Sequence, residues 1–265
     1  MNETELLFTE VLNCERTSLY LNRQKRLDKK ISSKISQVLK RRIGGEPIEY
    51  ILGKCEFMGL EFKLNQDVLI PRPETEILVE VVIKQLSAVN CQLSACKILE
   101  IGTGSGCVAV SLAKLLPEAE IFATDISELA LKVARENARL NNVESRIQFI
   151  HCDLFSSELQ TLDSCDYIVS NPPYILTAEI GKLAAEVQFE PISALDGGRD
   201  GLDFYRRIIR ESPGFLRKGG FLILEMGFGQ CENIKEIFKL CKKFEVKEII
   251  KDYNNIDRVI VATRK

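Results

Sequence analysis

The spacing of hydrophobic residues divides the chain into an N-terminal helical part and a longer part of mixed pattern. Apolar side chains recur at helical spacing over residues 1–43, and the Gly-Gly-Glu-Pro sequence at 44–47 ends that pattern. Short apolar runs at 50–52 and 60–64 then predict a β-hairpin or an irregular linker. Because proline disfavours helical backbone in the residue before it, we expect the next helix to start near Glu74.

Short apolar runs alternate with helical segments from residue 97 onward, which predicts a parallel sheet with helices on both faces. The predicted strands are 97–101, 120–124, 146–150, 167–170 and 221–224, and the predicted helices are 107–116, 127–141, 201–217 and 229–243. The last two runs, 244–250 and 258–263, have no room for a helix between them and predict an antiparallel pair. The expected fold class is α/β, with a mostly parallel, seven-stranded sheet whose last strand is antiparallel, and a small helical N-terminal domain.

Composition and charge narrow the possible partners. The net charge is −2, so the surface as a whole does not attract nucleic acid or anionic lipid. The stretch 16–42 differs, with ten Lys or Arg residues against the single acid Asp28. We interpret it first as a solvated helix face and second as a docking site for an acidic macromolecule. No apolar run has the length of a membrane span, and the first twenty residues lack a basic leader, so we expect a cytoplasmic protein.

Cysteine and histidine usage excludes several kinds of catalytic site. The nine cysteines, Cys91 among them, include no CxxC pair, so we expect free thiols in a reducing cytoplasm and no metal site. The single histidine, His151, excludes mechanisms that need two or more histidines, such as those of the HExxH zinc hydrolases. It follows the apolar run RIQFI and no GxSxG motif accompanies it, so we interpret His151 as a strand-end residue.

A glycine-rich loop directly after the first predicted sheet strand is the first candidate binding motif. It comprises Gly102, Thr103, Gly104, Ser105 and Gly106, and the acid Glu100 precedes it. Glycines let the backbone turn sharply and approach a ligand closely, and the following helix presents free N–H groups. A dinucleotide fold has the order GxGxxG, but here the third glycine comes one residue early and position 107 is cysteine. The order acid-x-GxGxG is typical of class I S-adenosylmethionine (AdoMet) methyltransferases.

Acidic residues after the next two strands extend this candidate cofactor site. Asp125 ends the second strand, where a carboxylate can accept hydrogen bonds from both ribose hydroxyls; its alternative role is an N-cap for the helix that starts at Ser127. After the third strand, Asp153 is suited to bind an adenine amino group, and Leu154 and Phe155 are suited to pack on the ring or to join the core. Together these residues predict a nucleoside site.

The tetrapeptide Asn171-Pro172-Pro173-Tyr174 follows the fourth strand and is the most informative motif in the chain. Because proline has a carbonyl but no N–H, the turn presents hydrogen-bond acceptors with few competing donors. The Asn171 side-chain oxygen and the Pro172 carbonyl can together accept both hydrogens of one NH2 group, while Tyr174 covers a flat substrate. Such a grip orients the nitrogen lone pair for in-line methyl transfer, so positioning supplies a large part of the catalysis. The alternative interpretation is a plain proline-rich turn.

Nearly the whole chain resembles the release factor glutamine N5-methyltransferases, the PrmC/HemK family. The matching segments, besides the motifs above, are Gly45–Ile48, Leu52-Gly53, Leu69–Glu76 (LIPRPETE), Phe189–Pro191, Ala194–Gly198, Asp200–Leu202 and Leu224–Gly227. The resemblance implies a helical domain at 1–65 that helps to hold the release factor, a β-hairpin linker to about residue 73, and a Rossmann-like, AdoMet-dependent catalytic domain at 74–265. It also implies that AdoMet contacts Gly102–Gly106, Asp125, Leu154 and Asn171. Some members have tryptophan at the position of Leu154, and here Phe155 is the alternative residue for packing on the adenine.

The function that this resemblance implies is transfer of a methyl group to the glutamine of a Gly-Gly-Gln motif in peptide-chain release factors, with AdoMet leaving as S-adenosylhomocysteine. We expect a monomer without a nucleic-acid substrate. Three alternatives remain open. An adenine-N6 methyltransferase would also have NPPY, but the basic stretch 16–42 carries only Tyr20 as an aromatic residue for base stacking. A silent AdoMet-binding scaffold would not need the NPPY turn, and the glycine spacing disfavours an NAD(P) oxidoreductase.

Overall fold

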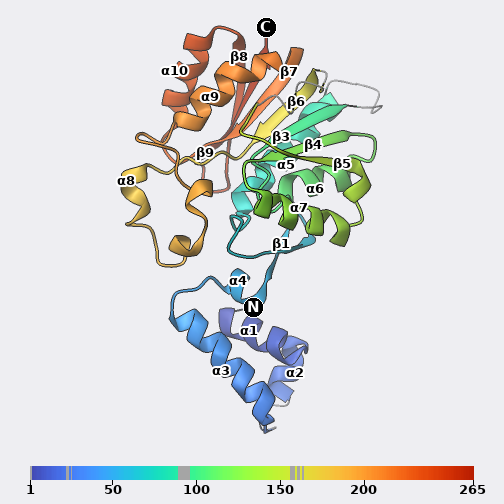
Figure 1. Ribbon diagram of the computed structural model, residues 1–265, viewed down its shortest axis with the longest axis vertical. Coiled ribbons are helices and arrows are strands. Elements are labelled where there is room, and N and C mark those ends of the chain that lie inside the picture. The colour runs from blue at the N-terminus through green and yellow to red at the C-terminus, as the bar shows by residue number, and fades with distance from the viewer. Residues whose placement is uncertain are drawn as a thin grey trace.

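The chain folds into a small helical lobe and a larger α/β lobe (Figure 1). The computed structural model describes residues 2–21, 24, 26–88, 96–155, 159, 162 and 164–265. The helices are α1 (Glu3–Leu12), α2 (Arg16–Leu21), α3 (Lys29–Ile43), α4 (Ile48–Leu52), α5 (Pro73–Ala88), α6 (Cys107–Leu115), α7 (Glu128–Leu140), α8 (Thr177–Ile180), α9 (Asp203–Glu211) and α10 (Cys231–Cys241). The strands are β1 (Lys54–Phe57), β2 (Leu60–Lys63), β3 (Lys97–Ile101), β4 (Glu120–Asp125), β5 (Ile147–His151), β6 (Cys165–Ser170), β7 (Leu216–Glu225), β8 (Phe244–Lys251) and β9 (Asp257–Arg264).

The N-terminal lobe is helical, as its hydrophobic spacing predicts. The Asn2 side chain accepts from the Glu5 backbone N–H at 2.8 Å, and the Glu5 side chain accepts from the Asn2 N–H, so both groups cap the start of α1. Leu7, Val38 and Ile51, from α1, α3 and α4, form a small buried core. Arg23 and Lys25, two of the ten basic residues of the stretch 16–42, lie outside the described residues.

The predicted hairpin is present, but later residues form it. Residues 50–52 belong to α4, because Pro47 presets a backbone suited to a helix start and Gly53, with φ of 73°, ends the helix in the left-handed region. The antiparallel strands β1 and β2 follow, and Met58 and Gly59 at φ of 52° and 71° make the two-residue turn. The five residues of α4 are too few to show a helical hydrophobic period, so the sequence pattern does not distinguish this helix from a strand.

The seven strands of the main sheet have the order β5-β4-β3-β6-β7-β9-β8. All pairs are parallel except those of β9, which runs antiparallel to both of its neighbours. This confirms the predicted α/β class and the antiparallel last strand. The strand order reverses between β3 and β6, which is the place where open α/β sheets form a ligand crevice outside the carboxyl ends of their strands.

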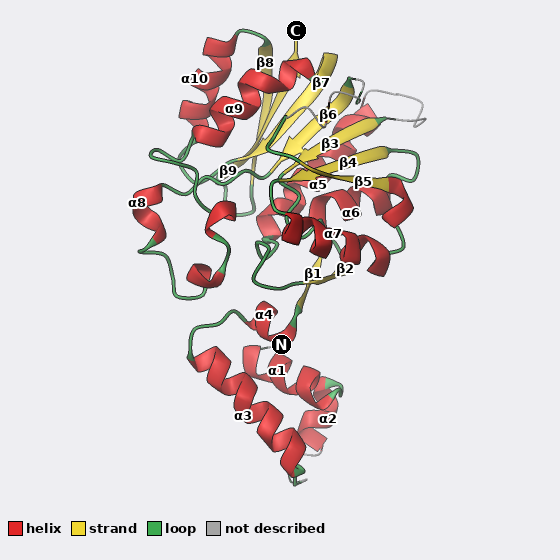
Figure 2. Ribbon diagram, in the orientation of Figure 1, coloured by secondary structure: helices red, strands yellow, loops and turns green. Residues whose placement is uncertain are grey.

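Helices cover both faces of the sheet (Figure 2). Residues from α5 and α6 pack with Ile98 and Ile223 in one core, whereas residues from α9 and α10 pack with Leu99 and Leu222 in a second core on the other face. The predicted helix 201–217 was too long: α9 ends at Glu211. Ser-Pro-Gly at 212–214 interrupts the helical pattern, and β7 begins at Leu216.

The fully buried Asn137 on α7 joins the hairpin to the glycine loop. Its Oδ1 accepts from the Lys63 N–H at 2.7 Å, and its Nδ2 donates to the carbonyls of Lys63 at 3.0 Å and Ser105 at 2.8 Å. The β1–β2 hairpin is therefore attached to the larger lobe.

In the described part of the chain, no helix has the length and apolarity needed to cross a membrane.

Candidate active site

The glycine loop and the NPPY turn start side by side at the carboxyl edge of the sheet. Ile101, the last residue of β3, is paired with Ser170, the last residue of β6, and the Ser170 hydroxyl donates to the Ile101 carbonyl at 2.8 Å. Gly102 and Asn171 are the next residues along each strand. The two motifs, separated by about seventy residues in the sequence, therefore meet at the point where the strand order reverses.

The residues of the glycine loop divide into those that leave space and those that hold the loop. Gly102 and Gly104 have φ of 73° and 54°, and a Cβ on either would meet no atom within 4 Å. In contrast, a Cβ on Gly106 would lie 3.0 Å from the Ala134 Cβ, so glycine there permits close packing of α6 on α7. Thr103 and Ser105 are buried and stabilise the loop from inside. The open positions form a cradle in which a ligand can approach the backbone.

Glu100 supports this loop from beneath. Its Oε2 accepts from the Thr103 hydroxyl at 2.7 Å and from the Ala109 backbone N–H at 3.0 Å, so one carboxyl group holds both the loop and the first turn of α6. Burial raises the pKa of Glu100 to about 8, because no cation compensates the loss of solvation. Glu100 is 4% exposed and so acts through the loop rather than on a ligand.

Asp125 borders the loop at the end of β4. Its Oδ2 accepts from the Gly104 N–H at 2.8 Å, and its Oδ1 accepts from the Ser127 N–H at 2.9 Å. The side-chain cap of α7 is Ser127, which accepts from the Ala130 N–H, so Asp125 does not have the alternative N-cap role. Burial raises the pKa of Asp125 even though these N–H groups favour its charged form. A half-buried carboxylate is thus preset next to the open glycines.

The three candidates after β5 have different surroundings. The Asp153 carboxylate is exposed and pairs with Arg207 at 2.8 Å. Leu154 is buried at a φ of 53°. The Phe155 ring stacks on Phe215 at a centroid distance of 5.0 Å and packs against the core between the sheet, α9 and α10. Asp153 and Phe155 therefore already have side-chain partners, whereas Gly102 and Gly104 border open space.

The NPPY turn borders a cavity of about 170 Å³. It is lined by Leu69, Arg72, Asn171, Pro172, Tyr174, Ile175, Leu183, Val187, Ala194 and Leu195. Arg72 forms an ion pair with the buried Glu190, which joins the IPRP segment to the FEP segment beside the cavity. Burial raises the pKa of Tyr174 to about 12, so its hydroxyl is neutral near pH 7. The cavity combines apolar walls with the Asn171 amide, as expected for a small polar side chain.

Close backbone contacts hold the turn in place. A Cβ on Gly197 would lie 2.7 Å from the Tyr174 Cα, and a Cβ on Gly201 would overlap the Tyr174 carbonyl oxygen. Gln230 donates through Nε2 to the carbonyls of Tyr174 at 3.0 Å and Gly201 at 3.2 Å, while its Oε1 accepts from the Gly227 N–H at 3.1 Å. The ALDGG-x-DGL and LEMG segments therefore support the turn and leave its cavity side free.

Sequence reasoning did not assign a role to several of these supporting residues. Glu190, Thr75 and Glu225 lie within segments that carry the family resemblance, which was the available signal for them. Gln230 lies just after the LEMG segment, and no motif marks it. Thr75 accepts from Asn171 Nδ2 at 3.1 Å, so it contacts the central residue of the turn directly.

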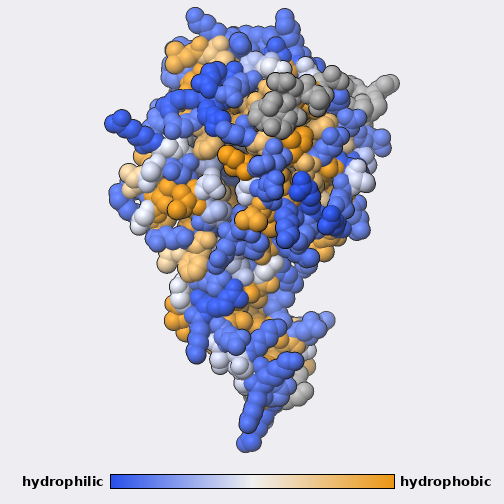
Figure 3. All heavy atoms as spheres, viewed as in Figure 1, coloured by the Kyte–Doolittle hydropathy of each residue, from blue (hydrophilic) through white to orange (hydrophobic). Residues whose placement is uncertain are grey.

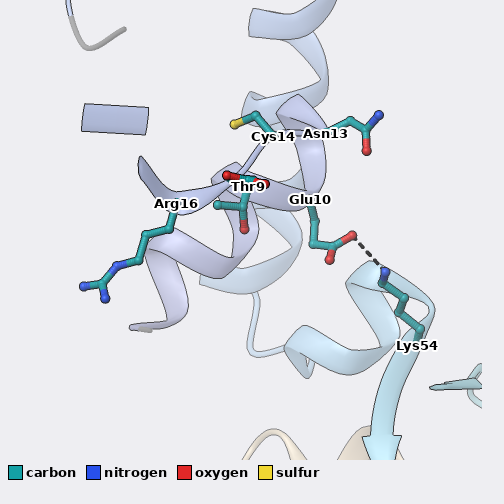
Figure 4. Close-up of a pocket in the computed structure, with 7 residues that line it drawn as sticks. Thr9, Glu10, Asn13, Cys14, Arg16 and Lys54 are labelled. Atoms are coloured by element: carbon teal, nitrogen blue, oxygen red, sulfur yellow. Dashed lines mark ion pairs between the residues drawn. The ribbon is translucent and has the colours of Figure 1, made fainter. Parts of the chain in front are cut away.

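The other groups considered from the sequence lie elsewhere. His151 ends β5, as expected, and its ring Nε2 lies 2.8 Å from the Ile126 carbonyl oxygen. All eight described cysteines are free thiols, and Cys91 lies outside the described residues. A second hollow of about 500 Å³ lies among the N-terminal helices, where Glu10 and Lys54 form an ion pair at 3.1 Å (Figure 4). None of the predicted site residues lines it.

Each lobe matches the model of a known protein family. The model of the PrmC N-terminal domain matches residues 1–53, and the model of the methyltransferase small domain matches residues 74–190. The structure of a methyltransferase from Pyrococcus furiosus has the same fold, with a TM-score of 0.56, 20% identity, and coverage of 86% of this chain and 98% of the other.

Two full-length relatives have the same description. The release factor glutamine methyltransferase of Thermodesulfovibrio yellowstonii is 39% identical over 265 residues, which cover 100% of this chain and 92% of the relative. That of Moorella thermoacetica is 40% identical over 263 residues, covering 99% of this chain and 91% of the relative. With an adjoining glycine loop and NPPY turn and with similarity over its full length, the chain belongs to the release factor glutamine methyltransferase family.

Proposed function

We propose that this protein transfers a methyl group from AdoMet to the side-chain amide nitrogen of the glutamine in the Gly-Gly-Gln motif of peptide-chain release factors. The observation that carries the proposal is the pairing of Ile101 with Ser170, because it sets the open glycine loop beside the NPPY turn. A methyl donor on the loop and an acceptor at the turn would meet at one sheet edge. In-line transfer needs this proximity above all.

The residues of the loop fit AdoMet. The open space at Gly102 and Gly104 admits the backbone approach of a ligand, and Asp125 supplies a carboxylate for ribose hydroxyls. Leu154 or Phe155 would pack on the adenine, with Asp153 near its amino group, although the stacking of Phe155 on Phe215 favours Leu154 for the adenine contact. AdoMet supplies an electrophilic methyl group on a sulfonium and leaves as S-adenosylhomocysteine.

The residues of the turn fit a primary amide. Asn171 Oδ1 accepts one hydrogen of the glutamine NH2 group and the Pro172 carbonyl accepts the other, while Pro173 fixes the backbone and Tyr174 covers the amide plane. The cavity is lined by Asn171, Pro172 and Tyr174. This grip directs the nitrogen lone pair at the methyl group. Alkylation acidifies the nitrogen, so a strong general base is not required and water can accept the proton.

The N-terminal lobe is proposed to help dock the release factor. The sequence places its boundary near residue 65 and the catalytic domain at 74–265, but the bonds of Lys63 to Asn137 favour a boundary before the hairpin, so we propose that the catalytic domain starts at Lys54. Arg42 supports a position close to the substrate cavity, because it pairs with Glu186, one residue before the cavity-lining Val187. The lower end of this lobe is mainly hydrophilic, and hydrophobic side chains gather over the region of α8 (Figure 3).

We further propose that the protein acts in the cytoplasm as a monomer.

A methyl-transfer assay tests the function. The protein is incubated with labelled AdoMet and either a purified release factor or DNA and RNA, and mass spectrometry locates the label. We expect the methyl group on the glutamine of the Gly-Gly-Gln motif. Labelled adenine would support the adenine-N6 alternative, and AdoMet binding without transfer to any of them would support a silent scaffold.

A further inference from the structure

A chain of buried polar groups lies behind the NPPY turn. The Asn171 amide donates through Nδ2 to the Thr75 hydroxyl at 3.1 Å. Thr75, in the first turn of α5, is 3% exposed, and the Glu225 side chain behind it, at the end of β7, is 1% exposed. Parallel pairing of Ser170 with Leu224 places Asn171 and Glu225 at the ends of neighbouring strands. Three segments that are distant in sequence thus meet at one point.

The surroundings of Thr75 favour one direction for its hydrogen bond with Asn171. A hydroxyl that accepts from an amide N–H still has its own proton to donate. Thr75 lowers the pKa of the Glu225 carboxyl, although burial raises that pKa overall, to about 7. Glu225 Oε2 has no hydrogen-bond partner among the described residues. A buried carboxyl with spare acceptor capacity attracts the hydroxyl proton and so favours acceptance from Asn171.

An asparagine amide has a donor on one side and an acceptor on the other. When Nδ2 is committed to Thr75, Oδ1 faces the opposite way, and no described residue donates to it. A free asparagine side chain can rotate by half a turn and present its NH2 group instead, which would repel the NH2 group of a substrate. The orientation of this amide therefore decides whether the cavity accepts or rejects an amide substrate.

We propose that Thr75, supported by Glu225, is a positioning residue that fixes the Asn171 amide with its oxygen toward the substrate cavity. The proposal rests on the function proposed above, because the benefit of this orientation depends on an acceptor that carries an NH2 group. Thr75 itself does not line the cavity. Its effect reaches the reaction only through Asn171.

The test uses the full-length protein with substitutions at Thr75 that keep its shape. Thr75→Val removes the hydroxyl and Thr75→Ser retains it. We expect Thr75→Val to lower the single-turnover methylation rate roughly three- to ten-fold, the effect of losing one neutral hydrogen bond, with KM for the release factor unchanged. Thr75→Ser should restore the rate. The matched control is Thr263→Val, which removes a hydroxyl that donates to the Gly220 carbonyl at 3.2 Å, far from the turn, and should leave the rate unchanged.

A double-mutant cycle separates positioning from a general loss of stability. In an Asn171→Ala background, Thr75→Val should have no further effect on the rate, because the amide that it orients is absent. Multiplying effects would overturn the proposal, and so would a wild-type rate in Thr75→Val or equal impairment in Thr75→Ser.

A measurement without substrate distinguishes failure of this proposal from failure of the proposed function. In nitrogen-15 NMR spectra, the Asn171 side-chain N–H protons should exchange slowly with solvent in the wild type and in Thr75→Ser, and rapidly in Thr75→Val. Equal exchange in all three proteins would overturn the positioning role whatever the substrate is. Slow exchange in a wild type that fails to methylate release factors would overturn only the substrate.

Discussion

The two halves of the site both rest on a buried carboxyl group, but they are stabilised over very different sequence distances. Beneath the glycine loop, Glu100 binds donors from Thr103 and Ala109, which are three and nine residues away. Beneath the NPPY turn, Asn171 depends on Thr75, 96 residues away, and on Glu225 behind it. The cofactor half is thus a local structure, whereas the acceptor half is assembled by the tertiary fold.

This difference indicates how each half responds to change. The open glycines of the loop leave space for a ligand, and substitutions there act on binding. The turn is enclosed by Gly197, Gly201 and Gln230, so substitutions around it act through packing and orientation. Substitutions in the two halves are therefore expected to differ in kind and in size.

Asn171→Ala removes the oriented acceptor at the reacting centre. By analogy with the loss of one oxyanion-hole contact, we expect turnover to fall by about 10²–10³, or about 2.7–4 kcal/mol. Single-turnover methylation of a release factor measures this. A melting temperature close to that of the wild type is the control for folding, and a wild-type rate would contradict the role of the acceptor half.

Asp125→Ala tests the cofactor half. Loss of charge-assisted hydrogen bonds should weaken AdoMet binding by about 1.5–3 kcal/mol, which is roughly ten- to a hundred-fold or slightly more. Calorimetry measures the dissociation constant. Asp153→Ala is the comparison, and we expect a smaller loss because Asp153 already pairs with Arg207. The assignment fails if Asp153→Ala weakens binding more than Asp125→Ala, or if NAD binds more tightly than AdoMet.

Gly201→Ala and Gly219→Ala separate close packing from backbone strain. Both glycines have nearly the same φ, 73° and 75°, but only at Gly201 would a Cβ collide, with the Tyr174 carbonyl oxygen and with Gln230 Nε2 at 2.7 Å. We expect Gly201→Ala to cost about 1–3 kcal/mol more than Gly219→Ala in free energy of unfolding, and to lower turnover as well. Urea unfolding measures the difference, and equal losses would show that the turn has room to move.

The buried carboxyls predict that stability falls as pH rises. In the unfolded chain Glu100 and Glu225 ionise near 4.5, whereas in the folded protein burial raises the pKa to about 8 for Glu100 and about 7 for Glu225. The folded state therefore binds more protons between these values, so each group lowers the unfolding free energy by up to about 1.4 kcal/mol per pH unit. Glu225→Gln should flatten the slope below pH 7, and Glu100→Gln should flatten it up to pH 8. Urea unfolding at several pH values measures both, and an unchanged slope would contradict the burial effect.

The sequence was sufficient for the parts of the site that are local. The glycine order, the acid at 125 and the NPPY turn each occupy a few consecutive residues, and the alternation of strands and helices places them at one sheet edge. Thr75 and Gln230 could not be assigned, because their contacts with Asn171 and Tyr174 join segments that are distant in the sequence. Phe155 was equally ambiguous: an aromatic residue after a strand fits both a ligand and a core, and its partner Phe215 is sixty residues away.

The bonds of Asn137 determine where this protein can be cut. A fragment that begins at residue 74 loses the Lys63 N–H and carbonyl, so of the three bonds of the Asn137 amide only that to the Ser105 carbonyl remains, and the face of α7 that the hairpin covers is uncovered. A fragment that begins at Lys54 keeps the hairpin and satisfies the amide. A catalytic fragment for expression should therefore start before β1. The hairpin is structurally part of the catalytic lobe and not of the helical lobe that precedes it.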